Sequence, residues 1–150
     1  EKEYVPNANH GLYGTYNLGR LVAFYNAVIT DSAIPKFDWS VSADSIYLEV
    51  YSAEDYKVTK WAAVNENDRD FRVPVIGKVW EATEIPLTSD NRYAVHFSKP
   101  ENGFKAGLLE VVFESNTEVP FTFTTGTVVT PDAYPFGPFT PNKPLGTTAN

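Results

Sequence analysis

The two histidines of this chain, His10 and His96, are its side chains best suited to proton transfer near neutral pH. His10 follows a short apolar run and stands in a loop of Asn and Gly residues, directly before an amphipathic segment. A loop between a strand and a helix is a setting in which hydrolases place a general base. His10 is therefore the candidate catalytic residue, and the alternative is an ordinary loop histidine.

The other candidates for chemistry favour structural roles. His96 lies in an alternating segment and is expected to face solvent. Two distant histidines and no Cys provide neither a zinc-ligand cluster nor a thiolate nucleophile. Glu66, Asp68 and Asp70 lack the turn glycine and the final bidentate Glu of a calcium loop, so a solvated loop is the better interpretation. We predict no metal site and no cofactor.

Composition excludes several classes of partner. The chain has 150 residues, and its 12 Lys and Arg are outnumbered by 19 Asp and Glu, so it carries no basic surface for nucleic acid. It contains no apolar run of about 18 residues, so no membrane span is expected. Met is absent, which leads us to expect a chain trimmed or excised from something longer.

One helix must position the His10 loop. Apolar residues from position 18 to position 29 recur with a helical period, with Asn17 as the expected N-cap and Pro35 beyond the end. The face consists of Leu18, Leu21, Val22, Tyr25, Val28 and Ile29. An isolated helix of this length is marginal in water, so we expect this face to pack on a second polypeptide. Residues 3–6 are expected to form a short strand.

The rest of the chain alternates with a period of two, which is typical of half-buried strands. The predicted strands are 37–41, 46–50, 57–64, 71–76, 79–85, 91–97, 104–113 and 119–129. Short strands at this spacing, without helices between them, predict a mostly β fold: an antiparallel β-sandwich of immunoglobulin or fibronectin-III type, with a closed barrel as the competing geometry. The expected buried residues are Trp39, Leu48, Trp61, Val95, Leu108 and Phe123.

The chain divides by composition into three parts. We expect 1–33 to form a terminal strand, the His10 loop and a helix, 34–130 to form the sandwich, and 131–150 to form an extended Pro-rich tail. The aromatic residues of the tail, Tyr134, Phe136 and Phe139, are expected to pack on the sandwich or on a partner.

Several motifs resemble a known family. They are Tyr4-Val5-Pro6-Asn7-Ala8-Asn9-His10-Gly11-Leu12, Phe24-Tyr25, Ile34-Pro35-Lys36-Phe37-Asp38-Trp39, Lys60-Trp61-Ala62-Ala63-Val64-Asn65, Arg69-Asp70-Phe71-Arg72, Gly77-Lys78-Val79-Trp80 and Phe121-Thr122-Phe123-Thr124-Thr125. In this order they resemble the C-terminal half of the PhoPQ-activated pathogenicity-related family, which includes the autocrine proliferation repressor proteins.

The resemblance implies the end of a secreted or periplasmic α/β-hydrolase-like protein, followed by a β-sandwich. It also implies that His10 matches the family's candidate catalytic histidine, and that the serine elbow, the acidic triad partner and the main sheet lie upstream of this chain. The upstream hydrolase-like polypeptide is then the expected partner. The Arg-Asp-Phe-Arg stretch is expected to fix a loop through hydrogen bonds.

We therefore interpret the chain as a C-terminal fragment of a secreted α/β-hydrolase-like protein that is not an enzyme by itself. It would supply His10 and an accessory β-sandwich. A non-catalytic binding, assembly or extracellular signalling module is the alternative. An independent fibronectin-like adhesion domain is a third interpretation, and the amphipathic helix argues against it.

Overall fold

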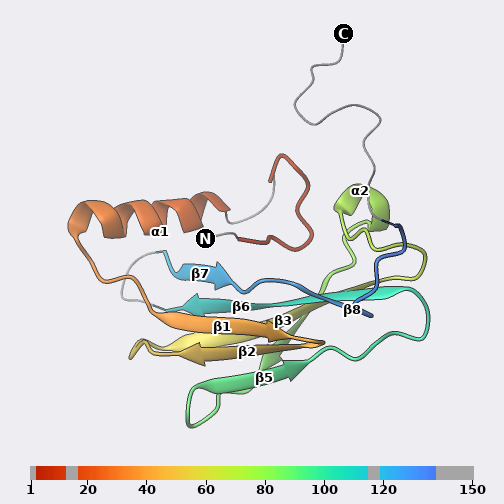
Figure 1. The fold of residues 1–150 in the computed structure, drawn as a ribbon. Helices are drawn as coiled ribbons and strands as arrows, with labels where there is room; N and C mark the ends of the chain where they lie inside the picture. Colours follow the sequence, from red (N-terminus) through yellow and green to blue (C-terminus); the bar gives the residue numbers. More distant parts are fainter. Residues whose placement is uncertain (1–2, 13–16, 115–118, 138–150) are drawn as a thin grey trace.

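The computed structural model describes residues 3–12, 17–114 and 119–137. Its elements are α1 (Asn17–Thr30), β1 (Phe37–Ser42), β2 (Ser45–Val50), β3 (Tyr56–Asn65), α2 (Val73–Ile76), β4 (Glu81–Ile85), β5 (Arg92–His96), β6 (Phe104–Phe113), β7 (Phe121–Thr124) and β8 (Val128–Thr130) (Figure 1). None of the helices in these ranges is long and apolar enough to cross a membrane.

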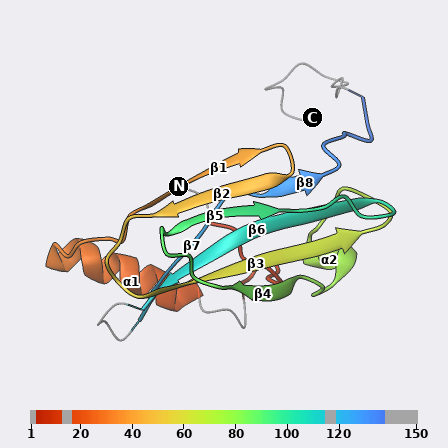
Figure 2. The ribbon, with the colours of Figure 1, turned by 90° about the horizontal axis from the view of Figure 1, so that it is seen from below.

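The strands form two antiparallel sheets. One has the order β1-β2-β5, and the other has the order β4-β3-β6-β7 with β8 also paired to β6. The two sheets lie face to face, and α1 and α2 lie towards opposite ends of them (Figures 1 and 2). The immunoglobulin constant order places the fourth strand beside the fifth, whereas β4 pairs with β3 here. The prediction of a mostly β chain with two antiparallel sheets is confirmed, and the described strands do not close into a barrel.

The core lies between the sheets. β2 contributes Ile46, Leu48 and Val50, and β6 contributes Leu109, Val111 and Phe113, all of them buried. Alternate residues of each strand point inwards, which is the basis of the period of two in the sequence.

The predicted buried residues have mixed outcomes. Leu48 and Leu108 are buried, whereas Trp61, Val95 and Phe123 are half-buried. The prediction for Trp39 is wrong, because its side chain lies on edge strand β1 and is 42% exposed. The Trp39 ring covers Gly126, where an added Cβ would lie 2.6 Å from a ring carbon. Trp39 therefore packs at the rim of the sandwich.

Three predicted strands differ from the structure. Residues 71–76 contain the short helix α2, because Pro74 fits the first turn of a helix and cannot donate to a ladder. The segment 119–129 divides into β7 and β8 at Thr125, whose Oγ1 accepts the Leu109 amide at 3.0 Å in place of a backbone carbonyl. Residues 3–6 form no strand within the described chain.

The described part of the tail does not bury its aromatic rings. Tyr134 and Phe136 are 79% and 77% exposed, so the prediction that they pack on this chain's own surface is wrong. Arg69 limits the tail's freedom: its guanidinium lies 4.2 Å from the centre of the Tyr134 ring, and Nη2 lies 3.3 Å from an Asp132 oxygen. Phe139 lies outside the described residues, and packing of the tail on a partner stays a prediction.

Candidate functional site

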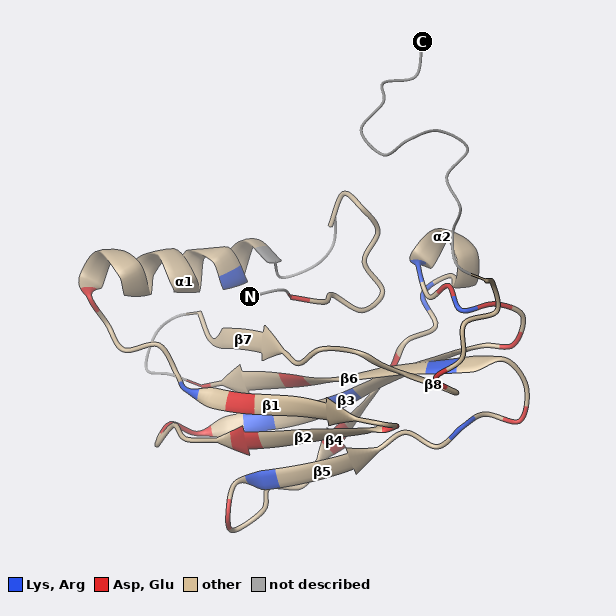
Figure 3. Ribbon diagram, in the orientation of Figure 1, with Lys and Arg blue, Asp and Glu red and all other residues tan. Residues whose placement is uncertain are grey.

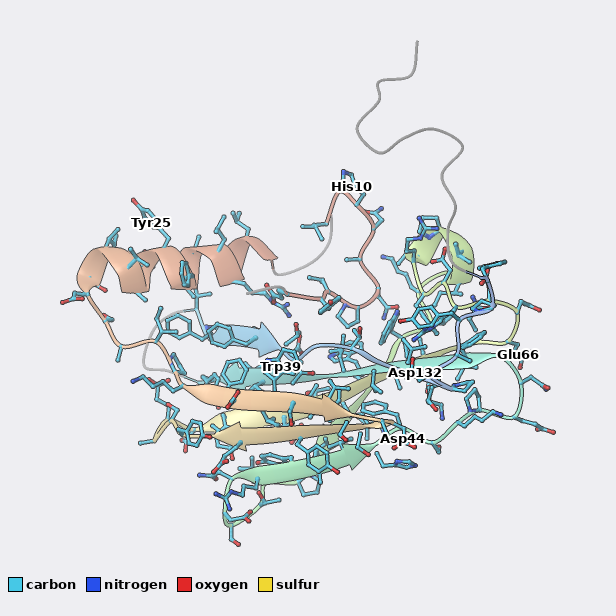
Figure 4. All side chains as sticks on the ribbon, viewed as in Figure 1. His10, Tyr25, Trp39, Asp44, Glu66 and Asp132 are labelled. Carbon is cyan, nitrogen blue, oxygen red and sulfur yellow. The ribbon has the colours of Figure 1, made fainter. Side chains whose placement is uncertain are left out.

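The loop that carries His10 consists of two consecutive turns. The Ala8 amide donates to the Val5 carbonyl at 3.4 Å, and the Leu12 amide donates to the Asn9 carbonyl at 3.0 Å. Asn7 has φ 59°, a left-handed conformation that Asn tolerates better than most residues. His10 therefore lies at the tip of the loop, where Figure 4 shows its ring directed away from the sheets.

The structure brings no catalytic partner to His10. Its side chain is exposed, and no residue in the described ranges donates to it or accepts from it. A general base needs a nucleophile within hydrogen-bond reach and a third group that orients the ring. The catalytic role of His10 stays a prediction, since it depends on groups from outside this chain.

A side-chain amide holds the His10 loop on the sandwich. Asn7 Nδ2 donates to the Trp80 carbonyl at 2.9 Å, and Asn7 Oδ1 accepts the Trp80 amide at 3.0 Å. The Trp80 indole in turn donates to the Phe71 carbonyl at 3.3 Å, and the two rings meet edge to face. The Asn7 side chain therefore bonds the Trp80 backbone as the backbone of a neighbouring strand would, and it holds the base of the His10 loop on the sandwich.

The next link in this chain of contacts is the loop that follows β3. Asn65 is buried, accepts the amides of Asn67 and Asp68 on Oδ1, and donates from Nδ2 to the Asp70 carbonyl at 2.8 Å. The segments quoted for the family resemblance thus meet in space: Asn7, Trp80, Phe71 and Asn65 come from four of its motifs. Together these residues hold the His10 loop and the loop after β3 in place on the sandwich.

Asp70 and Arg72 close the same loop. The Arg72 side chain donates to both Asp70 oxygens, and the Arg72 amide donates to Oδ1 at 3.1 Å. These bonds favour the charged carboxylate and lower the pKa of Asp70 to about 2. The expectation that Arg-Asp-Phe-Arg forms a loop-fixing hydrogen-bond cluster is confirmed.

A second cluster holds α1 on the outer face of the sheet β4-β3-β6-β7. Arg20 Nη2 lies 2.6 Å from Glu110 Oε2, and Arg20 also pairs with Glu3. Trp61 Nε1 donates to the other Glu110 oxygen at 3.3 Å. The Arg20 and Glu110 side chains are 16% and 12% exposed, so this ion pair is shielded from bulk water.

The orientation of α1 differs from what its sequence pattern suggests. Ala23 and Ala27, 5% and 4% exposed, face the protein and join the core cluster, so the helix does rest on its own sandwich. The seven large apolar residues of α1 are between 37% and 73% exposed. They are Leu18, Leu21, Val22, Phe24, Tyr25, Val28 and Ile29.

This outward surface, hereafter the α1 face, carries no charge. Arg20 is the one charged residue of α1, and it is engaged with Glu110 and Glu3 (Figure 3). Large apolar patches without charges on a soluble protein mark interaction surfaces. Figure 4 shows Tyr25 and His10 both directed away from the sheets on the same side.

Sequence reasoning missed a contact among Ser45, Asp44 and His96. His96 Nδ1 lies 3.0 Å from Asp44 Oδ1 and 3.5 Å from Ser45 Oγ. A triad needs the serine and the carboxylate on opposite ring nitrogens, whereas both lie on Nδ1 here. His96 is exposed, as predicted, and this group is a surface contact at the β1-β2 turn. No cluster of three metal-ligating residues occurs in the described ranges.

Comparison of the sequence with known proteins shows which family the chain resembles. The sequence pattern of the family described as PhoPQ-activated pathogenicity-related protein matches residues 2–72, so this part of the chain belongs to that family, as the resemblance predicts. The chain is also similar to autocrine proliferation repressor protein A from Dictyostelium discoideum, with 32% identity over 158 aligned positions. The alignment covers 89% of this chain and 32% of that protein, so the chain spans about a third of its relative. No solved structure matches.

Proposed function

We propose that the chain is the C-terminal part of a secreted α/β-hydrolase-like protein, to which it supplies the His10 loop and an accessory β-sandwich. The observation that carries this proposal is the α1 face, which lies exposed on the same side of the molecule as His10. A hydrolase portion that covers this face would bring its nucleophile towards His10. The family match over residues 2–72 includes both features.

The energetics favour such a partner. Complete burial of a Leu, Ile, Val or Phe side chain stabilises by about 1.5–3 kcal/mol. The seven side chains of the α1 face are about half exposed, so covering them would contribute on the order of 5–10 kcal/mol before the entropic cost of association.

Serine-hydrolase labelling of the full-length protein tests the catalytic part. A fluorophosphonate probe should label its nucleophile, His10→Gln should abolish labelling, and the matched control His96→Gln should leave it unchanged. Equal labelling of both variants would exclude His10 as the base. Fractionation of expressing cells should find the protein outside the cell, or in the periplasm of a bacterium.

Hydrogen exchange tests the docking part. Amides of residues 18–29 should exchange more slowly in the full-length protein than in the 150-residue chain, because a partner covers the helix. Equal rates would mean that the α1 face stays open.

The second candidate is a non-catalytic extracellular signalling or binding module. It is favoured by the free side chain of His10 in the described residues and by the name of the relative, a proliferation repressor. The two candidates differ in the labelling experiment, because a module without catalysis would dock its upstream portion yet remain unlabelled by the fluorophosphonate.

A further inference from the structure

The outer face of the sheet β1-β2-β5 holds an open groove of about 310 Å³. This face is the one turned away from α1, so the groove stays accessible when a partner covers the α1 face (Figure 1). Residues of all three strands line it, together with Tyr51 just beyond the end of β2.

Strand register sorts these side chains into two rows. Ser40, Tyr47 and Ala94 form one row, because Ser40 pairs with Tyr47 and Tyr47 pairs with Ala94. Ser40 and Ala94 are small and leave the Tyr47 ring uncovered, and Tyr47 is 47% exposed. The groove therefore contains a half-exposed aromatic ring whose cross-strand neighbours are small side chains.

The second row, Asp38, Glu49 and Arg92, supplies donors and acceptors. Arg92 donates from Nε and Nη2 to Glu49 Oε1 at 2.9 and 2.7 Å, so the two side chains form a partly exposed ion pair beside the Tyr47 row. Asp38 Oδ1 accepts the Trp39 amide at 2.8 Å, while Asp38 Oδ2 and Arg92 Nη1 make no hydrogen bond within the described chain. Partial desolvation and the neighbouring Glu49 carboxylate raise the pKa of Tyr51.

We propose that this groove binds an uncharged oligosaccharide. A sugar ring presents an apolar C–H face for Tyr47 and adjacent hydroxyls for the carboxylate and guanidinium groups of the neighbouring row. The groove is too open to enclose a small metabolite, which normally has most of its surface buried, but a chain of sugars can lie along it. The net charge of −7 opposes anionic polymers.

Titration of the 150-residue chain with defined sugars tests this proposal. The probes are cellohexaose, laminarihexaose, xylohexaose, mannohexaose and chitohexaose, with a heparin tetrasaccharide as the charged comparison. At least one neutral probe should bind, seen by calorimetry, and should shift ¹H–¹⁵N NMR signals of β1, β2 and β5. Tyr47→Ala should weaken binding about tenfold or more, and Tyr47→Phe should stay within about twofold, because the ring is retained.

Two controls keep the result specific. Tyr25→Ala removes an exposed tyrosine from α1 and should leave affinity unchanged, whereas Arg92→Lys should weaken binding because it loses the planar fork. Circular dichroism establishes that each variant is folded. The proposal is overturned if no neutral probe binds at about 10 mM, if heparin binds instead, or if a folded Tyr47→Ala keeps its affinity.

Discussion

Removal of the Asn7 side chain should release the His10 loop from the sandwich while the sheets stay folded. Asn7 makes two hydrogen bonds with the backbone of Trp80, and both are partly buried. Asn7→Gly removes these bonds without backbone strain, because glycine accepts φ 59° freely.

The magnitude follows from these contacts. Each bond contributes about 0.5–1.5 kcal/mol net, so Asn7→Gly should destabilise the docked loop by about 1–3 kcal/mol. Asn7→Ala should cost about 1–2 kcal/mol more, because an alanine disfavours the left-handed conformation. The difference between the two variants isolates the conformational preference from the hydrogen bonds.

Native-state hydrogen exchange of the Trp80 amide is the assay, since this amide donates to Asn7 Oδ1. Its exchange should accelerate about 5- to 150-fold in Asn7→Gly, the range that corresponds to 1–3 kcal/mol. The urea midpoint of the sheets should change little, because the loop opens locally. Asn9→Ala is the matched control, since among the described residues Asn9 Oδ1 accepts only the exposed Gly11 amide.

One result would refute this reasoning. If Asn7→Gly leaves Trp80 exchange at the wild-type rate, the Asn7 side chain does not hold the loop. A large loss of global stability in the same variant would instead mean that the loop and the sandwich unfold as one unit.

Three further predictions concern stability. Glu110→Ala should lower the free energy of unfolding by about 1.5–3 kcal/mol in urea titrations, because it removes the shielded carboxylate that pairs with Arg20 and accepts from Trp61 Nε1, and it leaves Arg20 with the more exposed Glu3; a loss near zero would show that Glu3 and water replace the lost contacts. Gly107→Ala should destabilise the sandwich by about 1–3 kcal/mol or more, since the new Cβ would meet the Phe97 ring at 1.9 Å, and unchanged thermal unfolding would contradict this packing. The folded pKa of Asp70 is about 2, below its unfolded value near 3.9, so its contribution is present above about pH 4 and is lost as pH falls towards 2. Asp70→Asn should therefore destabilise clearly more at pH 7 than at pH 2, and an equal loss at both would exclude charge as the cause.

Strand prediction succeeded where the signal is local. The hairpin of β1 and β2 follows from alternation along one segment, because the period of two is fixed by the backbone itself. The long strand β6 was also predicted, although six consecutive residues of it are buried on both faces of its sheet. The strand prediction failed at 71–76, where a proline that cannot donate to a ladder lies in the first turn of α2. It also failed at Thr125, where the threonine hydroxyl accepts the Leu109 amide and the strand is interrupted. Whether a side chain takes the place of a backbone hydrogen bond depends on which backbone groups lie next to it in the folded protein.

The candidate site was predicted only in part. The position of His10 in a loop before a helix can be read from the sequence, and its motif carries the family match. The Asn7–Trp80 clamp joins residues that are 73 positions apart, so no local pattern indicates it. The groove around Tyr47 forms only when β1, β2 and β5 pair in register, because its two rows of side chains each combine residues from all three strands.

By itself, the sequence determined the mostly β class, the single long helix and the family, because local periodicity and ordered motifs are properties of the chain. Tertiary structure decided which face of α1 rests on the sandwich. The helical pattern shows where large apolar residues gather, yet the sheet accepts the small side chains of Ala23 and Ala27, which let the helix approach closely and place Arg20 against Glu110. Whether a helix face meets its own domain or solvent depends on the shape and charge of the surface opposite, and that surface exists only in the folded protein.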